Sequence, residues 1–250
     1  MLAASCAPRL VSLPSDPGAP LPDYAETYRI VTAACAGVRT LTAELGLSGS
    51  AGGQGVRGRA IVGFERPQSM RLEGVAPFGP PAFIMVARNM RGTLLLPRDN
   101  RANRDAAPEQ ILGALTGVSL SPADLQAVLT GCVVPPGTPV AGRLHQNGWA
   151  SIDVEGGASI YLEREGPQWR IRAGRRPGWQ MEYPQWQGAF PADIRLRATD
   201  PGLDVNLAAT VSQLETNLPL DQSAFAVNVP PGAIDLTVAE LRRAGPLRNQ

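Results

Sequence analysis

Few residues of this 250-residue chain have the types and spacing that catalysis requires. His145 is the only histidine, so a metal site with two histidine ligands is excluded and a Ser–His–Asp triad would depend on this one residue. The motifs G-x-S-x-G and C-x-x-C do not occur. Because His145 lies two residues before the turn dipeptide Asn147-Gly148, we expect it to be a solvated loop residue.

Acidic residues give a second indication of chemistry. Asp153 and Glu155 share one face of a predicted strand, and Glu163 and Glu165 share a face of the next. Paired carboxylates can hydrolyse glycosidic bonds, but acids that alternate along a half-exposed strand are typical of its solvent face. All 23 basic residues are arginine, so a Schiff-base or P-loop lysine is excluded. We therefore predict a protein that is not an enzyme and has no metal site and no cofactor.

Four arginines lie close to two tryptophans in one segment. The six residues are Trp169, Arg170, Arg172, Arg175, Arg176 and Trp179. Single-stranded nucleic acid is bound by such residue types, but a net charge of +1 gives no reason to expect a nucleic-acid partner. We interpret the segment first as an edge strand with exposed arginines. Contact with lipid headgroups or with an acidic partner is the second interpretation.

One loop is unusually apolar. Residues 76–81 read Ala-Pro-Phe-Gly-Pro-Pro, which places Phe78 at a turn flanked by prolines. Two interpretations are open, because the ring can fold back onto the core or protrude and contact a membrane or an acyl chain.

The N-terminal residues suggest an anchor. Small residues directly before Cys6 resemble the cleavage site of a bacterial lipoprotein signal peptide, although only five residues precede this cysteine. The range from Pro8 to Pro22 contains five prolines and few large apolar residues, as a tether would. We therefore expect residues 1–22 to comprise a shortened signal, a lipidated Cys6 and a tether, and residues 23–250 to form one domain.

The other two cysteines, Cys35 and Cys132, stand beside apolar residues. Burial as two small hydrophobic side chains is the first interpretation, and a disulfide in an oxidising compartment is the other.

The rest of the chain predicts a mainly β domain with a few short helices. Alternating apolar residues predict strands at 38–48, 57–65, 159–165, 169–173, 194–198, 203–211 and 225–229. Helices are expected at 23–37, 108–118, 121–131 and 237–244, the third beginning with Ser121 as N-cap and Pro122 at the first helical position. We expect about ten antiparallel strands.

The order of these elements resembles the LolA/LolB superfamily, the periplasmic carrier and the outer-membrane acceptor of bacterial lipoproteins. The resemblance spans roughly residues 24–245. It rests on Arg71-Leu72-Glu73-Gly74 followed by Pro77-Phe78-Gly79, on a helix pair ending in Leu129-Thr130-Gly131, and on Phe225-x4-Pro230-x-Gly232-Ala233. It implies an incomplete antiparallel β-barrel whose open side is covered by short lid helices, with an apolar cavity for acyl chains.

Three features are more similar to the LolB branch than to LolA. They are Cys6 with its tether, the loop Pro77-Phe78-Gly79, which resembles the LolB loop with an exposed leucine, and the segment Gly117–Pro122, which resembles a Gly-x-x-Leu-Pro phrase with one residue inserted. The resemblance implies a monomeric outer-membrane lipoprotein that faces the periplasm and binds lipoprotein acyl chains, with a LolA-like carrier as partner.

Strand alternation and helix periodicity then select the residues of this site. We predict a cavity lined by Leu45, Phe64, Leu72, Leu196 and Leu207, a lid formed by Ile111, Leu112, Leu115, Leu125 and Leu129, and a protruding Phe78. An error of one residue in register would invert the strand faces. Two alternatives remain: a sensory or structural envelope lipoprotein that binds a protein partner, and an envelope hydrolase that uses His145 or a carboxylate pair.

Overall fold

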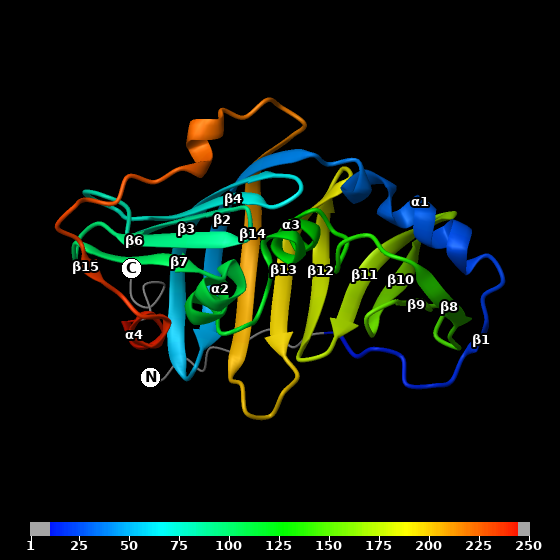
Figure 1. Cartoon of the computed structure of the whole chain (residues 1–250). Coiled ribbons are helices and arrows are strands. Elements are labelled where there is room, and N and C mark those ends of the chain that lie inside the picture. Colours follow the sequence, from blue (N-terminus) through cyan, green and yellow to red (C-terminus); the bar gives the residue numbers. More distant parts are fainter. Residues whose placement is uncertain (1–10, 245–250) are drawn as a thin grey trace.

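One sheet runs through the whole structure, a computed structural model that describes residues 11–244 (Figure 1). Its strands pair antiparallel except for the last strand, which pairs in parallel. The strands are β1 Ala19–Pro20, β2 Thr40–Ala51, β3 Gln54–Glu65, β4 Ser69–Val75, β5 Phe83–Arg88, β6 Arg91–Leu96, β7 Arg101–Ala106, β8 Pro139–Leu144, β9 Ala150–Val154, β10 Ala158–Glu165, β11 Gln168–Arg176, β12 Trp179–Gln187, β13 Phe190–Ala198, β14 Val205–Thr216 and β15 Ile234–Asp235. The helices are α1 Tyr24–Ala36, α2 Pro108–Thr116, α3 Pro122–Leu129 and α4 Val238–Ala244, with a 3-10 turn, η1, at Gln222–Phe225.

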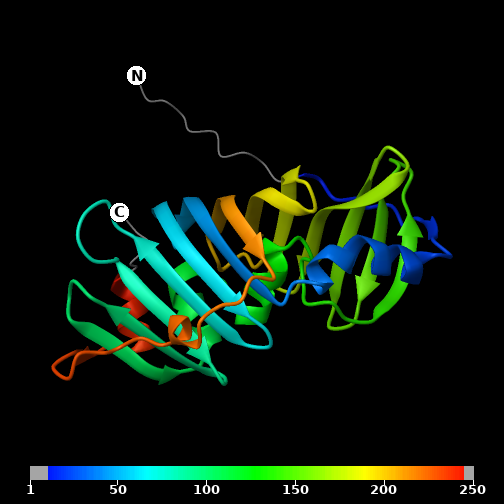
Figure 2. The same cartoon turned by 90° about the horizontal axis from the view of Figure 1, so that it is seen from above.

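The sheet is open, with β1 at one edge and β15 at the other. Its strand order is β1-β8-β9-β10-β11-β12-β13-β14-β2-β3-β4-β5-β6-β7-β15. Pairing of β2 with β14 joins the early and late parts of the chain near the middle of the sheet. Figure 2 shows that the sheet is curved and that α1 lies across the strands of one half. The prediction of a mainly β fold with short covering helices is thus confirmed.

The predicted number of about ten strands is wrong, because the sheet has fifteen. The edge strands β1 and β15 have only two residues each, too few to show any alternation. β12 contains Pro184 and is interrupted by register shifts, which hide its period of two. Conversely, residues 225–229 alternate but form no strand, and Phe225 ends η1 instead.

The two helices in the middle of the chain begin and end where local chemistry predicts. In α3 the hydroxyl of Ser121 accepts the N–H of Asp124 at 3.0 Å, and the Asp124 carboxylate accepts the N–H of Ser121 at 2.9 Å. This reciprocal capping box satisfies two N–H groups that the helix cannot pair internally. In α2 Pro108 occupies the first turn, and Gly117 ends the helix in the left-handed conformation (φ 78°).

Glycines allow the helices to approach the sheet closely. A Cβ at Gly92 in β6 would lie 2.8 Å from Cδ1 of Ile111 in α2. A Cβ at Gly142 in β8 would lie 2.2 Å from Cβ of Tyr24 in α1. Side chains from these helices therefore share one continuous apolar core with the face of the sheet that they cover.

The opposite face of the sheet carries the first residues that the structure describes. Val11 and Leu13 pack against a small cluster of Trp149, Tyr161 and Ala173. The Val11 N–H donates to the Glu182 carboxylate at 2.6 Å, and β1 adds to the edge of β8. Residues 11–22 of the predicted tether therefore lie along the domain, whereas Cys6 falls outside the described residues.

Candidate functional site

The predicted cavity and lid residues meet in one apolar core beneath α2 and α3. Leu45, Phe64, Leu72, Leu196, Ile111, Leu112, Leu115 and Leu129 are buried, and Leu207 and Leu125 are partly buried against them. Side chains of the helices therefore fill the space over this face of the sheet. A ligand could enter that space only if a helix moved away from the sheet.

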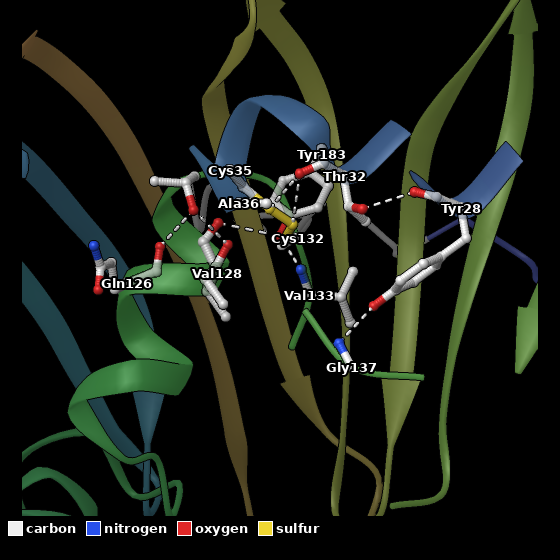
Figure 3. Close-up of a disulfide and its surroundings, with 12 residues drawn as sticks. Tyr28, Thr32, Cys35, Ala36, Gln126, Val128, Cys132, Val133, Gly137 and Tyr183 are labelled. Atoms are coloured by element: carbon white, nitrogen blue, oxygen red, sulfur yellow. Dashed lines mark hydrogen bonds between the residues drawn. A yellow bond between two sulfur atoms is a disulfide. The ribbon is translucent and has the colours of Figure 1, made fainter. Parts of the chain in front are cut away.

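Covalent and polar contacts fix α1 and α3 together (Figure 3). A disulfide joins Cys35 at the end of α1 to Cys132 just after α3, with the two Cα atoms 6.0 Å apart. Gly137 donates its N–H to the Tyr28 hydroxyl at 3.1 Å, and Asp124 of α3 forms an ion pair with Arg176 of β11. Of the two interpretations of Cys35 and Cys132, the structure therefore shows the disulfide.

A buried tyrosine anchors the same region to the sheet. The hydroxyl of Tyr183 in β12 donates to the carbonyl of Val128 and accepts the N–H of Val133, both at 3.1 Å. Burial raises the pKa of this phenol above its usual value near 10, and the hydrogen bond from Val133 acts in the opposite direction. Tyr183 therefore stays neutral and acts as a structural hydrogen-bonding group.

Replacing Tyr183 with phenylalanine is expected to lower the free energy of unfolding by about 1–3 kcal/mol. The substitution leaves the Val133 N–H and a Val128 carbonyl lone pair without a partner in a dry core, which costs their desolvation energy. Urea unfolding of the two proteins measures the difference. Tyr24→Phe is the control, since no hydrogen bond of the Tyr24 hydroxyl exists among residues 11–244, and equal losses in both variants would contradict the assigned role.

α2 lacks such attachments among the described residues. It packs against β6 and α4, and its N-cap, Ala107, offers no side-chain hydrogen bond. Ile111, Leu112 and Leu115 hold it to the sheet by apolar contact. Of the two predicted lid helices, α2 is therefore the one that, within residues 11–244, is held by packing alone.

A second feature on the helix-covered face is a groove beside α1, which we call the α1 groove. It has a volume of about 480 Å³ and is open to solvent. Its apolar lining is formed by Ile30, Val31, Ala34, Pro167, Trp169, Ile171, Trp186 and Ala189. Ile30 is 58% exposed, which is high for a large apolar side chain on a helix that packs against a sheet. The volume lies in the range typical of small-molecule sites.

The α1 groove adjoins a smaller, polar pocket of about 250 Å³, and the two share Glu165, Arg170, Ile171 and Trp186. Arginines at the junction lie over the tryptophan rings. The guanidinium carbon of Arg164 is 4.0 Å from the ring centroid of Trp169, and that of Arg170 is 5.0 Å from the ring centroid of Trp186. Apolar and cationic groups therefore meet at this end of the strands.

At the level of sequence, no family model and no curated protein matches this chain. Among solved structures, a LolA superfamily protein of Nitrosomonas europaea aligns with a TM-score of 0.50 at 8% identity, covering 84% of this chain and 98% of that chain. The chain has a LolA-like fold. A DUF1329 family protein of Desulfovibrio piger aligns with a TM-score of 0.49 at 10% identity, covering 83% of this chain and 97% of the other. At such identities the likeness shows the fold alone.

Phe78 lies on the surface, away from the apolar core. The ring is 87% exposed in the β4–β5 loop, and the guanidinium of Arg98 donates to the Phe78 carbonyl at 2.7 Å. Phe78 therefore does not fold back, and of the two interpretations of this loop the structure shows the protruding one.

The expectation for His145 is wrong, because its side chain is buried. Its Nε2 lies 2.9 Å from Oγ of Ser151 in β9, and its Nδ1 lies 3.3 Å from a carboxylate oxygen of Asp16. Sequence reasoning missed this contact because Asp16 lies on the N-terminal segment, 129 positions away. The N-terminal segment crosses the face of the sheet opposite the helices, and His145 lies beneath this segment.

The candidate carboxylate pairs are largely neutralised by arginine. Asp153 accepts from Arg143 at 2.6 Å, Glu163 lies 3.5 Å from Arg172, and Glu165 pairs with Arg170. Within residues 11–244, no group of three or more acidic, histidine or cysteine residues is placed to hold a metal ion. In the same part of the chain, no helix has the length and apolar character needed to cross a bilayer.

The interpretation of residues 169–179 as an edge strand is wrong. β11 lies inside the sheet between β10 and β12, and Trp169 lines the α1 groove. Sequence reasoning also missed Ile30, Val31 and Trp186 as lining residues. One signal could have indicated these lining residues. It is the presence of apolar residues, in particular Ile30, on the exposed side of the first helix.

Proposed function

We propose that this protein binds lipoprotein acyl chains without catalysis and accepts or localises lipoproteins at the outer membrane from its periplasmic side. One observation carries the proposal: on a LolA-like sheet, apolar side chains of a packing-held helix, α2, cover an apolar face. The disulfide supports an oxidising compartment such as the periplasm. The protruding Phe78 supports the LolB-like branch, for which lipidation of Cys6 remains a prediction.

The energetics of acyl transfer require such a covered interior. Removing an acyl chain from lipid must offset about 0.8 kcal/mol for each methylene, or on the order of 10 kcal/mol for a chain. A scatter of exposed apolar side chains cannot match this, because each contributes about 1.5–3 kcal/mol only when fully buried. In this proposal the acyl chain occupies the apolar surface that the ten cavity and lid residues, which pack together in one core, present when α2 moves away.

In this proposal α2 is the moving lid and α3 is fixed. Movement of α2 breaks apolar contacts of Ile111, Leu112 and Leu115 but no covalent bond. An entering acyl chain then replaces the leucine contacts with its own, so that opening and binding are coupled.

Phe78→Glu is expected to leave acyl-chain binding unchanged and to slow delivery of a bound lipid to vesicles about tenfold or more. Insertion of a phenyl ring into lipid is worth roughly 1.5–3 kcal/mol, and a carboxylate removes that gain. Transfer of a fluorescent fatty acid from protein to phospholipid vesicles measures the rate. Met90→Glu is the matched control, since Met90 is 73% exposed but lies at the other end of β5. Equal transfer rates for Phe78→Glu and the wild-type protein would contradict the membrane-facing role.

Hydrolysis is a second candidate function. It is favoured by the arrangement of Ser151, His145 and Asp16, in which the imidazole lies between a hydroxyl and a carboxylate as in a catalytic triad. Two observations argue against it. Ser151 is 5% exposed in the interior of β9, with strands paired on both sides, so little of its hydroxyl is accessible even though it lines a pocket of about 380 Å³ with His145 and Asp16. Asp16 belongs to the N-terminal segment, so exposing the serine would separate the trio. We therefore assign His145 to holding residues 11–20 against the sheet.

A further inference from the structure

We propose that the α1 groove binds the hydrocarbon chain of a single-chain anionic amphiphile, with the anionic end of the ligand beside Arg164. The inference rests on the proposed function only for the chemical class of the cargo. It adds a binding site separate from the surface beneath α2, and this site is open in the structure as it stands.

The shape and lining of the groove fit a hydrocarbon chain. Trp169 and Trp186 contribute large apolar surfaces from β11 and β12, and Ile30 of α1 lies exposed at the groove. Covering apolar surface of this kind is favourable in proportion to the area removed from water. Because the disulfide and the Tyr28 contact fix α1, the groove needs no lid movement to accept a ligand.

The charge at one end of the groove selects an anionic ligand. The adjoining polar pocket holds three arginines, Arg164, Arg170 and Arg172, and two glutamates, Glu163 and Glu165. Both glutamates are already paired, Glu163 with Arg172 and Glu165 with Arg170.

Of these three arginines, Arg164 alone lacks a carboxylate partner among residues 11–244. It donates to the carbonyl of Pro167 at 2.8 Å and lies over Trp169, and both of these residues line the α1 groove. A ligand carboxylate or phosphate at this position would form the ion pair that the protein does not supply. An apolar groove whose lining residues Pro167 and Trp169 contact a guanidinium with no carboxylate partner in the described part of the chain is complementary to an anionic amphiphile.

Tryptophan fluorescence can locate the ligand. Trp169 and Trp186 line the α1 groove, whereas Trp149 lies in the cluster on the opposite face and Trp179 is buried. We expect 2-bromododecanoate, whose bromine lies next to the carboxylate and quenches indoles on contact, to quench a large part of the wild-type fluorescence. In a Trp169→Phe/Trp186→Phe variant, which keeps the groove apolar, the remaining fluorescence should not be quenched. Quenching of the same size in the double variant, or none in the wild-type protein, would overturn the proposal.

Displacement of a fluorescent fatty acid separates this inference from the proposed function. Binding measured by displacement without quenching of Trp169 and Trp186 would show that an acyl site exists but that the α1 groove is not that site. Absence of both signals would contradict the groove and the proposed function together.

A charge variant tests the polar end. Arg164→Gln is expected to weaken dodecanoate binding about fivefold or more and to leave dodecanol binding unchanged. Arg197→Gln is the matched control, because Arg197 is exposed on β13 and forms no ion pair among the described residues. Equal effects of Arg164→Gln on the acid and the alcohol would contradict the assignment of Arg164 to the anionic end.

Discussion

Replacing Cys35 and Cys132 with serine is expected to lower the free energy of unfolding by roughly 2–4 kcal/mol. The disulfide closes a loop with a sequence separation of 97 residues, and in the chain-entropy account a cross-link across so long a loop restricts the unfolded chain strongly. It also joins α1 to the segment after α3, so its loss frees both helices from each other. Urea unfolding followed by tryptophan fluorescence measures the change.

Reduction of the wild-type protein provides the control. Dithiothreitol should lower its unfolding midpoint to that of the double-serine variant and leave the variant unchanged. If oxidised wild type and variant unfolded at the same urea concentration, the cross-link would have no role in stability and α3 could not be treated as fixed.

Leu115→Ala is expected to raise the affinity for a fluorescent fatty acid about tenfold or more while it destabilises the fold by about 2–5 kcal/mol. Leu115 belongs to α2 and its side chain is buried in the core beneath the helix. Truncating this side chain leaves a cavity in the closed state. Since the lid side chain and the acyl chain compete for one apolar surface, weakening the closed state increases the fraction of protein that is open to ligand. Apparent affinity rises with that fraction.

Ile152→Ala is the matched control for the lid. Ile152 is fully buried in the same core but lies in β9, away from α2. We expect a comparable loss of stability and no gain in affinity. A gain of the same size in both variants would mean that general loosening, rather than movement of α2, exposes the site.

Much of this fold could be predicted from the sequence because its strongest signals are local. The capping box at Ser121, the turn at Asn147-Gly148 and the alternation in β3 and β13 depend only on neighbouring residues, and the structure contains each of them. The resemblance in element order to LolA-like proteins was informative for the same reason. It draws on the sequence of elements rather than on any one residue.

Features that depend on distant residues could not be predicted. The contact of His145 with Asp16 and the pairing of Cys35 with Cys132 require knowledge of which segments meet in space. The α1 groove combines a helix near the N-terminus with strands 140 residues later, so no sequence window contains its lining. Periodicity identified Trp169 as a strand residue but could not show that α1 lies beside it.

Competition by lipopeptides tests the central claim most directly. Purified protein loaded with a fluorescent fatty acid is titrated with a synthetic acylated lipopeptide and with the same peptide lacking its acyl chains. Binding of lipoprotein acyl chains predicts displacement by the lipopeptide and none by the free peptide, with His145→Ala behaving as the wild-type protein. Failure to bind either the fatty acid or the lipopeptide would contradict the proposal. A stable complex with the unacylated peptide that left the fluorescent ligand in place would instead favour a protein-binding envelope lipoprotein on the same scaffold.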